Sequence, residues 1–279
     1  MSHPCLKDFH PLVARWFMET FGEPTPPQAA AWPRIAAGKN LLLLAPTGSG
    51  KTLAAFLKVI DRLYQEMERG ESLPGDGVRV LYVSPLKALN NDIYRNLELP
   101  LQGISRLFQD GVAQDGVFQH AREAGAQPGQ GLPEITRAVR SGDTPPAERQ
   151  RMLRQPPQIL ITTPESLFLI LSSKAARILR TVRCLIVDEI HTVFTEKRGA
   201  HLALSLERLQ NLVEEAGGPG TTLQRIGLSA TIRPLAEVAV FLGGYERDPE
   251  SGEWRPRPVE IIDAGGRKDL DLQIGRAHV

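Results

Sequence analysis

The segment 45–52 reads Ala-Pro-Thr-Gly-Ser-Gly-Lys-Thr, a spacing that suits the binding of a nucleoside triphosphate. Its glycines let the backbone curl so that N–H groups face an anion. Lys51 would reach the β- and γ-phosphates, and Thr52 would hold Mg²⁺. A Gly-Ser turn with a surface lysine is the simpler alternative, but an apolar run precedes the segment and a helical pattern follows it. We therefore expect a nucleoside triphosphate and Mg²⁺ to bind here, with phosphate contacts from Thr47, Gly48, Ser49, Gly50, Lys51 and Thr52.

A pair of carboxylates follows another apolar run, in the tetrad Asp188-Glu189-Ile190-His191. Asp188 could hold Mg²⁺ through water, and Glu189 could orient and deprotonate the water that attacks the triphosphate. Taken alone, the tetrad could be a strand that ends in a polar turn. Together with the phosphate loop it predicts NTP hydrolysis, with Lys51, Asp188 and Glu189 as the catalytic residues.

Two hydroxyl residues, Ser229 and Thr231, follow the apolar run 225–228. They could hydrogen-bond His191 and so relay the state of the nucleotide away from the phosphates. Helix capping is the alternative, because Ser and Thr are preferred caps and a helical pattern starts at Pro234. Taken alone, the pair favours the cap.

Small polar residues also end two further apolar runs, in the segments 84–91 and 162–166. Hydroxyls, amides and helix N-termini of this kind suit sugar-phosphate oxygens, which they contact without reading base identity. Capping is compatible with this role and is locally sufficient for Thr163. Upstream, Gln28 in Pro24-Thr25-Pro26-Pro27-Gln28 could pair with an adenine edge, because its amide offers both a donor and an acceptor.

The elements that must position these residues alternate along the chain. Short apolar runs typical of buried strands occupy 40–45, 78–84, 158–163, 184–188 and 225–229. Helical patterns occupy 52–69, 86–97, 165–173 and 199–215. This alternation predicts a parallel α/β sheet, whose functional residues lie at the carboxyl ends of its strands. We expect a flexible insertion at 111–131, a loop at 243–257, and a brief strand at 259–262 before a linker.

Composition sets broad limits on the function. The 279 residues carry a net charge of +1, so any nucleic-acid contact depends on a local groove rather than a global positive field. Only two cysteines, Cys5 and Cys184, are present, which argues against a disulfide framework. No apolar run is long enough to span a membrane, and the first residues lack the core of a signal peptide. We expect a cytoplasmic protein without a membrane partner.

The set of motifs resembles superfamily 2 helicases of the DEAD/DEAH type. Seven elements stand in family order: Gln28, the phosphate loop 45–52, the segment 84–91, Gly142-Asp143-Thr144, Thr163-Pro164-Glu165, the tetrad 188–191 and Ser229-Ala230-Thr231. The wording of these motifs, and of Lys197-Arg198-Gly199-Ala200-His201-Leu202, is most similar to the large helicase-related (Lhr) proteins. The resemblance covers about residues 10–263.

The resemblance implies a RecA-like P-loop NTPase fold, with a parallel sheet between helices in three layers. It implies an ATP-dependent motor that moves 3′ to 5′ on nucleic acid and unwinds duplexes in DNA repair. Its partner would be single-stranded DNA or a duplex junction, or else RNA or an RNA–DNA hybrid. By position, Thr25 and Gln28 would contact the nucleotide, with Gln28 reading adenine. Coupling would fall to His191, Ser229 and Thr231, and the tracked strand would lie along Pro85, Lys87, Gly142, Asp143 and Thr163.

Helicases of this kind close a second lobe over the nucleotide, and that lobe supplies an arginine finger. Only 48 residues follow Thr231, too few for another α/β domain. We expect residues 1–263 to form the first lobe and 264–279 a shortened linker with an artefactual tail, because 274–279 match a translated sequencing adapter. Such a fragment would bind ATP with little turnover. Two alternatives stay open: an ATPase that remodels RNA or protein–nucleic-acid complexes, and a non-enzymatic scaffold.

Overall fold

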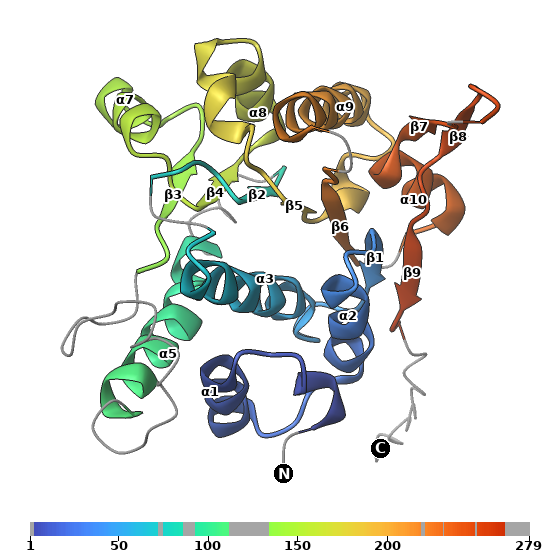
Figure 1. The fold of residues 1–279 in the computed structure, drawn as a ribbon. Helices are drawn as coiled ribbons and strands as arrows, with labels where there is room; N and C mark the ends of the chain where they lie inside the picture. The colour runs from blue at the N-terminus through green and yellow to red at the C-terminus, as the bar shows by residue number, and fades with distance from the viewer. Residues whose placement is uncertain are drawn as a thin grey trace, which may run out of the picture.

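A seven-stranded sheet forms the centre of the molecule, with helices on both of its faces (Figure 1). The computed structural model describes residues 3–71, 75–85, 93–111, 134–218, 221–230, 232–248 and 250–265. The strand order is β3-β4-β2-β5-β6-β1-β9, and every neighbouring pair is parallel. The strands are β1 (Leu41–Leu44), β2 (Val80–Val83), β3 (Arg137–Arg140), β4 (Ile159–Thr162), β5 (Cys184–Val187), β6 (Gln224–Ser229) and β9 (Glu260–Asp263).

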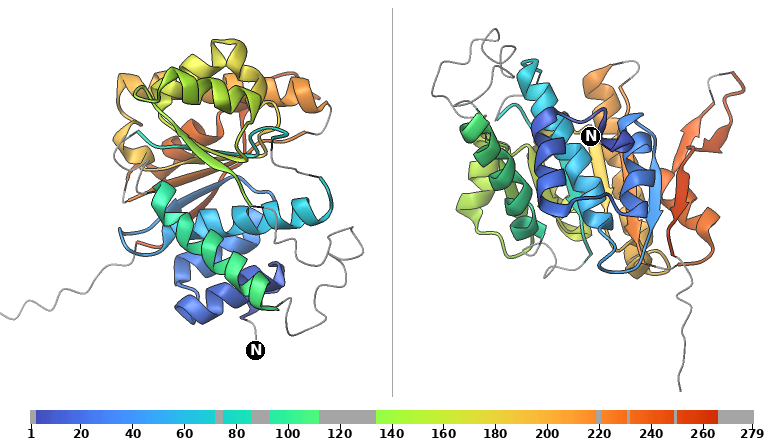
Figure 2. Two further views of the ribbon diagram at one scale, coloured as in Figure 1. Left: turned by 90° about the vertical axis from the view of Figure 1, so that its left-hand side faces the viewer. Right: turned by 90° about the horizontal axis from the view of Figure 1, so that it is seen from below.

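The helices make a layer on each side of the sheet, as the edge-on view in Figure 2 shows. One side carries α2 (Pro26–Ala36), α3 (Lys51–Glu68) and α5 (Glu98–Gly111), with η1 (Pro4–Leu6) and α1 (Pro11–Phe21) packed outside them. The other side carries α7 (Pro146–Arg154), α8 (Pro164–Leu171), η3 (Lys174–Leu179), α9 (Lys197–Gly217) and α10 (Leu235–Gly243). The predicted α/β fold with a parallel sheet between helix layers is confirmed.

Strand β1 shows why the sheet is buried on both faces. Leu41 and Leu43 belong to the core beneath α2 and α3, whereas Leu42 and Leu44 belong to the core beneath α9 and α10. All four side chains are almost fully buried. Because successive side chains of a strand point to opposite faces, a continuous apolar run satisfies both cores at once.

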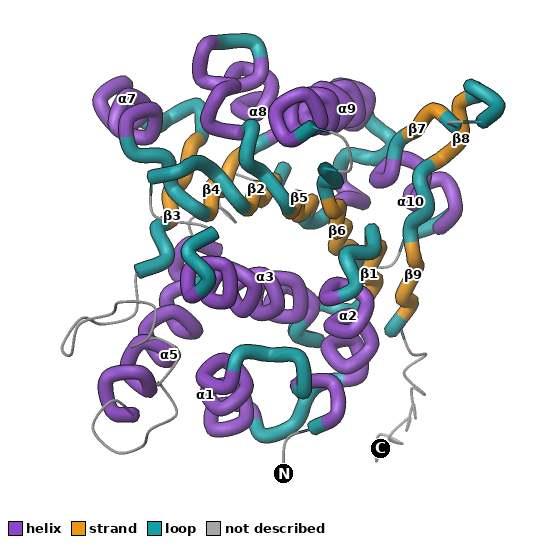
Figure 3. Tube along the Cα trace, in the orientation of Figure 1, coloured by secondary structure: helices purple, strands orange, loops and turns teal. Residues whose placement is uncertain are grey.

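The sequence-based boundaries agree with the observed strands and helices to within one or two residues where a continuous apolar run or a clear helical period exists. The prediction of a loop at 243–257 is wrong: β7 (Tyr245–Arg247) and β8 (Trp254–Pro256) form an antiparallel hairpin beside β9 (Figure 3). Helices α1, α5 and α7 and strand β3 were not predicted. The predicted strand at 259–262 is β9, which pairs with β1 at the edge of the sheet.

Several sequence-based expectations fall outside the described residues. They are the expectations for Lys87 and its neighbours in 86–92, for most of the insertion, for Thr231, and for the tail after Gly265. Among the helices that are described, none combines the length and the apolarity that crossing a lipid bilayer requires.

Candidate functional site

The phosphate loop joins the carboxyl end of β1 to the amino end of α3. Gly48 and Gly50 both adopt left-handed backbone conformations, with φ angles of 80° and 83°. The loop turns so that the N–H of Ser49 donates to the carbonyl of Pro46, at 3.3 Å. The hydroxyl oxygen of Ser49 is buried and has no hydrogen-bond partner among the described residues. A phosphate oxygen would accept a hydrogen bond from this hydroxyl, so the loop fits the predicted triphosphate.

Lys51 is the first residue of α3 and is only 5% exposed. Lys51 thus stands at the positive end of the helix dipole, a position that is unfavourable for a cation unless an anion is nearby. Burial raises the pKa of Asp188, and the positive charge of Lys51 opposes that rise. Half-buried Thr52 follows on the same turn. Both residues are therefore placed at the loop, as predicted.

Thr25 and Gln28 lie against this loop. The hydroxyl of Thr25 donates to the carbonyl of Ser49 at 3.0 Å, and the amide of Gln28 donates to the carbonyl of Gly50 at 3.5 Å. The amide oxygen of Gln28 accepts from the N–H of Thr25 at 2.9 Å. One N–H and one lone pair of the Gln28 amide remain for a ligand, but the side chain is only 3% exposed. Recognition of adenine by Gln28 stays a prediction. The geometry shows that Gln28 hydrogen-bonds the backbone of the phosphate loop.

Asp188 stands directly after β5 and is 4% exposed. Its carboxylate accepts hydrogen bonds from the Tyr82 hydroxyl and from the N–H of Glu189, the latter at 2.8 Å. Burial raises the pKa of Asp188, and these hydrogen bonds and the charge of Lys51 oppose that rise. Burial and the neighbouring carboxylates raise the pKa of the Tyr82 hydroxyl, which keeps it a proton donor.

A buried carboxylate of this kind suits Mg²⁺, which is bound through one or two carboxylates together with substrate phosphates. Thr52 and Asp188 would supply such oxygen ligands. No group of three or more His, Cys, Asp and Glu side chains that could form an all-protein metal cage exists in the described part of the chain. The donor set is that of a metal held jointly with a phosphate.

Glu189 is the one described non-glycine residue in the left-handed region, with a φ of 48°. A conformation of this kind costs on the order of 1–3 kcal/mol and is typical of functional sites. The Nδ1 atom of His191 lies 3.3 Å from the Glu189 carboxylate and also 3.3 Å from the Ser229 hydroxyl. Protonated, Nδ1 donates to the carboxylate; unprotonated, it accepts from Ser229. His191 thus connects Glu189 of the acidic pair to Ser229, the last residue of β6.

The sequence left two roles open for Ser229, a helix cap or a hydrogen bond to His191. Helix α10 begins at Leu235, with Pro234 at the capping position, so Ser229 is not a helix cap. The predicted hydrogen bond to His191 is confirmed.

Within the described part of the chain, the residues predicted to follow the nucleic-acid strand lie at the carboxyl ends of β2, β3 and β4. Gly142 and Asp143 are exposed in the turn after β3. Thr163 is 3% exposed, and its hydroxyl caps α8 by accepting from the N–H of Ser166 at 3.3 Å. Pro85 is buried, and its carbonyl accepts from Arg198 at 3.1 Å. We name the row formed by Pro85, Gly142, Asp143 and Thr163 the polar rim. Asp143 is exposed on this rim, whereas the buried hydroxyl of Thr163 is used in its cap.

Arg198 was not among the predicted site residues. Its guanidinium pairs with the carboxylate of Glu165 at 2.7 Å and also donates to the carbonyl of Pro85. A backbone hydrogen bond at Glu165 and this pairing hold the pKa of Glu165 below its usual range, against the effect of burial. Arg198 thereby ties Glu165 and Pro85 of the polar rim to the segment that follows Glu189 and His191. A signal was available: Arg198 lies in the first turn of α9, where the helix dipole disfavours cations unless a partner is present.

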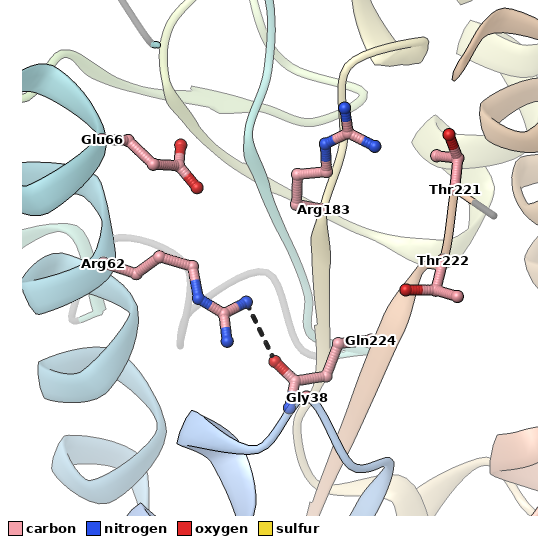
Figure 4. A pocket seen from close by; sticks show the side chains of 7 residues that line it. All are labelled: Gly38, Arg62, Glu66, Arg183, Thr221, Thr222 and Gln224. Atoms are coloured by element: carbon pink, nitrogen blue, oxygen red, sulfur yellow. Dashed lines mark hydrogen bonds between the residues drawn. The ribbon is translucent and has the colours of Figure 1, made fainter. Parts of the chain in front are cut away.

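A separate cavity of about 470 Å³ opens at the amino ends of β1, β5 and β6, the edge of the sheet opposite the phosphate loop. Its lining includes Arg62, Glu66 and Arg183, whose side chains face the same space in Figure 4. One oxygen of Glu66 is buried without a hydrogen-bond partner among the described residues, and burial raises the pKa of this carboxyl. None of the predicted site residues lines this cavity.

Comparison with known proteins was made on both sequence and structure. The family model described as DEAD/DEAH box helicase matches residues 25–238. A protein of Mycolicibacterium smegmatis named "Lhr helicase/ probable uracil glycosylase" is 52% identical over 266 residues, which are 95% of this chain and 15% of that protein. The "ATP-dependent helicase Lhr-Core" of Methanothermobacter thermautotrophicus is 46% identical over 266 residues, 95% of this chain and 27% of that protein. The chain thus spans about a quarter or less of the length of these relatives.

Among solved structures, the helicase Lhr of Mycobacterium smegmatis bound to ssDNA and AMP-PNP matches with a TM-score of 0.73 and 48% identity. The match covers 94% of this chain and 28% of that one. The DEAD-box helicase Mss116 bound to ssRNA and UDP-BeF matches with a TM-score of 0.65 over 91% of this chain and 43% of that one, at 15% identity. The second match supports the fold alone.

Proposed function

The chain belongs to the DEAD/DEAH box helicase family, and from this we propose that it is the ATP-binding first lobe of a longer DNA helicase or translocase. The observation that carries the proposal is the convergence of two strand ends. The phosphate loop after β1 presents Lys51 and an unpartnered Ser49 hydroxyl, and its lysine acts electrostatically on the buried Asp188 after β5. This is the arrangement that phosphoryl transfer requires, because such catalysis consists mainly of positioning and charge stabilisation.

The residues of this chain divide the work of hydrolysis. Lys51 and the loop backbone hold the β- and γ-phosphates, while Thr52 and Asp188 would hold Mg²⁺, which when bound neutralises charge on the phosphate oxygens. Glu189 orients the attacking water and takes its proton. Its backbone position after β5 places that carboxylate beside Asp188, whose oxygen accepts the Glu189 N–H.

Coupling of hydrolysis to nucleic acid is assigned to the residues that contact Glu189. His191 Nδ1 stands between the carboxylate of Glu189 and the hydroxyl of Ser229, so loss or gain of charge at the nucleotide changes which of them it binds. Ser229 ends β6, and Thr231 two residues later belongs to the same proposed coupling group. The tracked strand would lie along the polar rim, with Lys87 as a further contact.

We further propose that the intact protein supplies a second RecA-like lobe, whose arginine completes the site, and that this chain alone binds ATP with little turnover. Movement from 3′ to 5′ on DNA and a role in DNA repair are part of the same proposal and rest on the resemblance to Lhr proteins. A cytoplasmic location fits the two free thiols of Cys5 and Cys184.

The test uses the full-length gene product with a duplex that carries a single-stranded tail. Glu189→Gln should bind ATP yet lose nucleic-acid-stimulated hydrolysis and strand separation. Glu196→Gln is the matched control, because Glu196 is an exposed carboxylate seven residues further along the chain. Hydrolysis by Glu189→Gln at the rate of the control would refute the proposed mechanism. Comparison of DNA, RNA and hybrid duplexes identifies the substrate, and unwinding of RNA alone would overturn the assignment to DNA.

A further inference from the structure

Two arginines face each other at the outer end of the polar rim. Arg140 is the last residue of β3, which is the edge strand of the sheet, and Arg149 lies on α7, directly after the turn 141–145. Both side chains are half-buried. The Arg149 guanidinium donates to the carbonyl of Gly142 at 2.7 Å and to that of Ser141 at 3.5 Å, so it stabilises the backbone of this turn.

Neither arginine takes part in any ion pair of the described residues. The Nη1 atom of Arg140 and the Nε atom of Arg149 are both buried and have no hydrogen-bond partner there. Burial and the neighbouring charge of Arg149 lower the pKa of Arg140. Buried N–H groups without acceptors and two unneutralised like charges are a costly arrangement, and an anion would relieve both costs.

The position of the pair indicates which anion it would meet. The Arg149 guanidinium donates to the carbonyl of Gly142, a residue of the polar rim, and the backbone carbonyl of Arg140 accepts from the hydroxyl of Thr162 at the end of β4, at 2.7 Å. The exposed Gly142 and Asp143 stand between the pair and solvent on the same turn. An extended polyanion that follows the polar rim would therefore reach this pair at the edge of the sheet.

We propose that Arg140 and Arg149 together bind one phosphodiester group of the nucleic-acid strand at the outer end of the polar rim. The proposal rests on the proposed function and extends it to residues outside the recognised motifs. Guanidinium groups match phosphate oxygens geometrically and stay charged when partly buried, which ammonium groups do not. Arg149 has a second role, because the same guanidinium fixes the carbonyls of the turn that carries Gly142.

The experiment measures single-stranded DNA binding by the full-length protein across a range of salt concentrations. For single strands, each neutralised phosphate contributes about 0.7 to the slope of log affinity against log salt. Arg140→Gln combined with Arg149→Gln should weaken binding and reduce the magnitude of that slope by about 0.7, the value for one phosphate. Arg151→Gln combined with Arg154→Gln is the matched control: both are exposed arginines on the same helix, and their loss removes two charges as well. This control should keep the wild-type slope.

Three outcomes separate the possibilities. If the double variant keeps the affinity and slope of the control, the pair binds no phosphate and the inference is overturned. If the wild-type protein binds no nucleic acid, the proposed function fails and takes the inference with it. If the double variant melts at a lower temperature, Arg140→Gln alone decides, because the Nη1 atom of Arg140 has no hydrogen-bond partner within the described residues. Loss of one phosphate in that single variant supports the inference, and a slope unchanged from the control overturns it.

Discussion

Replacing Gly50 by alanine tests how the phosphate loop is held. A Cβ atom at Gly50 would meet the Gln28 amide nitrogen at 2.6 Å, a separation at which the glutamine must move. At Gly48, whose φ is nearly the same, a Cβ atom would meet nothing within 4 Å. The two glycines therefore form a matched pair, in which only Gly50→Ala disturbs Gln28.

The expected magnitudes follow from this geometry. An alanine in the left-handed region costs about 1–2 kcal/mol, and this applies to both variants. Displacing Gln28 breaks its hydrogen bond to the carbonyl of Gly50, which adds about 0.5–1.5 kcal/mol for Gly50→Ala. For a chain of this size, 1 kcal/mol corresponds to about 2–4 °C in melting temperature. Gly50→Ala should thus melt about 1–6 °C below Gly48→Ala.

The assay is thermal unfolding of four variants, with each glycine replacement made in the wild-type chain and in Gln28→Ala. Removing the Gln28 side chain should erase the difference between Gly48→Ala and Gly50→Ala, because only the backbone cost then remains. Equal melting temperatures of the two variants in the wild-type background would refute the reasoning. A difference that persists in Gln28→Ala would show that another contact is responsible.

Three further predictions concern residues outside the phosphate loop. Arg225→Leu should lower the free energy of unfolding by about 3–5 kcal/mol in denaturant titrations, because this 1% exposed side chain binds Glu207 and several buried carbonyls. A loss below about 1 kcal/mol would contradict this. Glu66→Gln should raise the melting temperature at neutral pH, because burial raises the Glu66 pKa and makes the charged form unfavourable in the folded chain. This gain should shrink as pH falls through that pKa, and a gain independent of pH would contradict the prediction. Arg198→Ala should weaken nucleic-acid binding several-fold in fluorescence anisotropy while nucleotide affinity is unchanged, because the variant loses the bonds of Arg198 to Glu165 and to Pro85 of the polar rim. Equal losses of both affinities would indicate a general structural role.

The sequence predicted the strands of the sheet well where both faces are buried. Strand β1 is a run of four leucines, and each face of the sheet needs two of them. Strand β3 lacked that signal, because Arg-Ala-Val-Arg at the edge of the sheet is only half-buried along its length. The hairpin of β7 and β8 was missed for a related reason: its strands are three residues each and mostly exposed, so pairing and not burial defines them.

The candidate site divides in the same way. Residues whose roles depend on local chain geometry, such as Lys51 after the loop and Asp188 after β5, stand where the pattern indicated. Arg198 was missed because its partners Glu165 and Pro85 are 33 and 113 residues away, and only the fold brings them together. The burial of Gln28 beneath the loop is likewise a tertiary property that no local pattern contains.

The central claim is that the loop after β1 binds the phosphates of ATP, and nucleotide affinity tests it most directly. The measurement is the dissociation constant of ATP with Mg²⁺ for the wild-type chain, Lys51→Ala and Lys39→Ala, an exposed lysine before β1 that serves as the charge-matched control. Lys51→Ala should bind at least tenfold more weakly, equivalent to about 1.4 kcal/mol, while Lys39→Ala binds as the wild type does. Equal affinities for the wild type and Lys51→Ala would contradict the account.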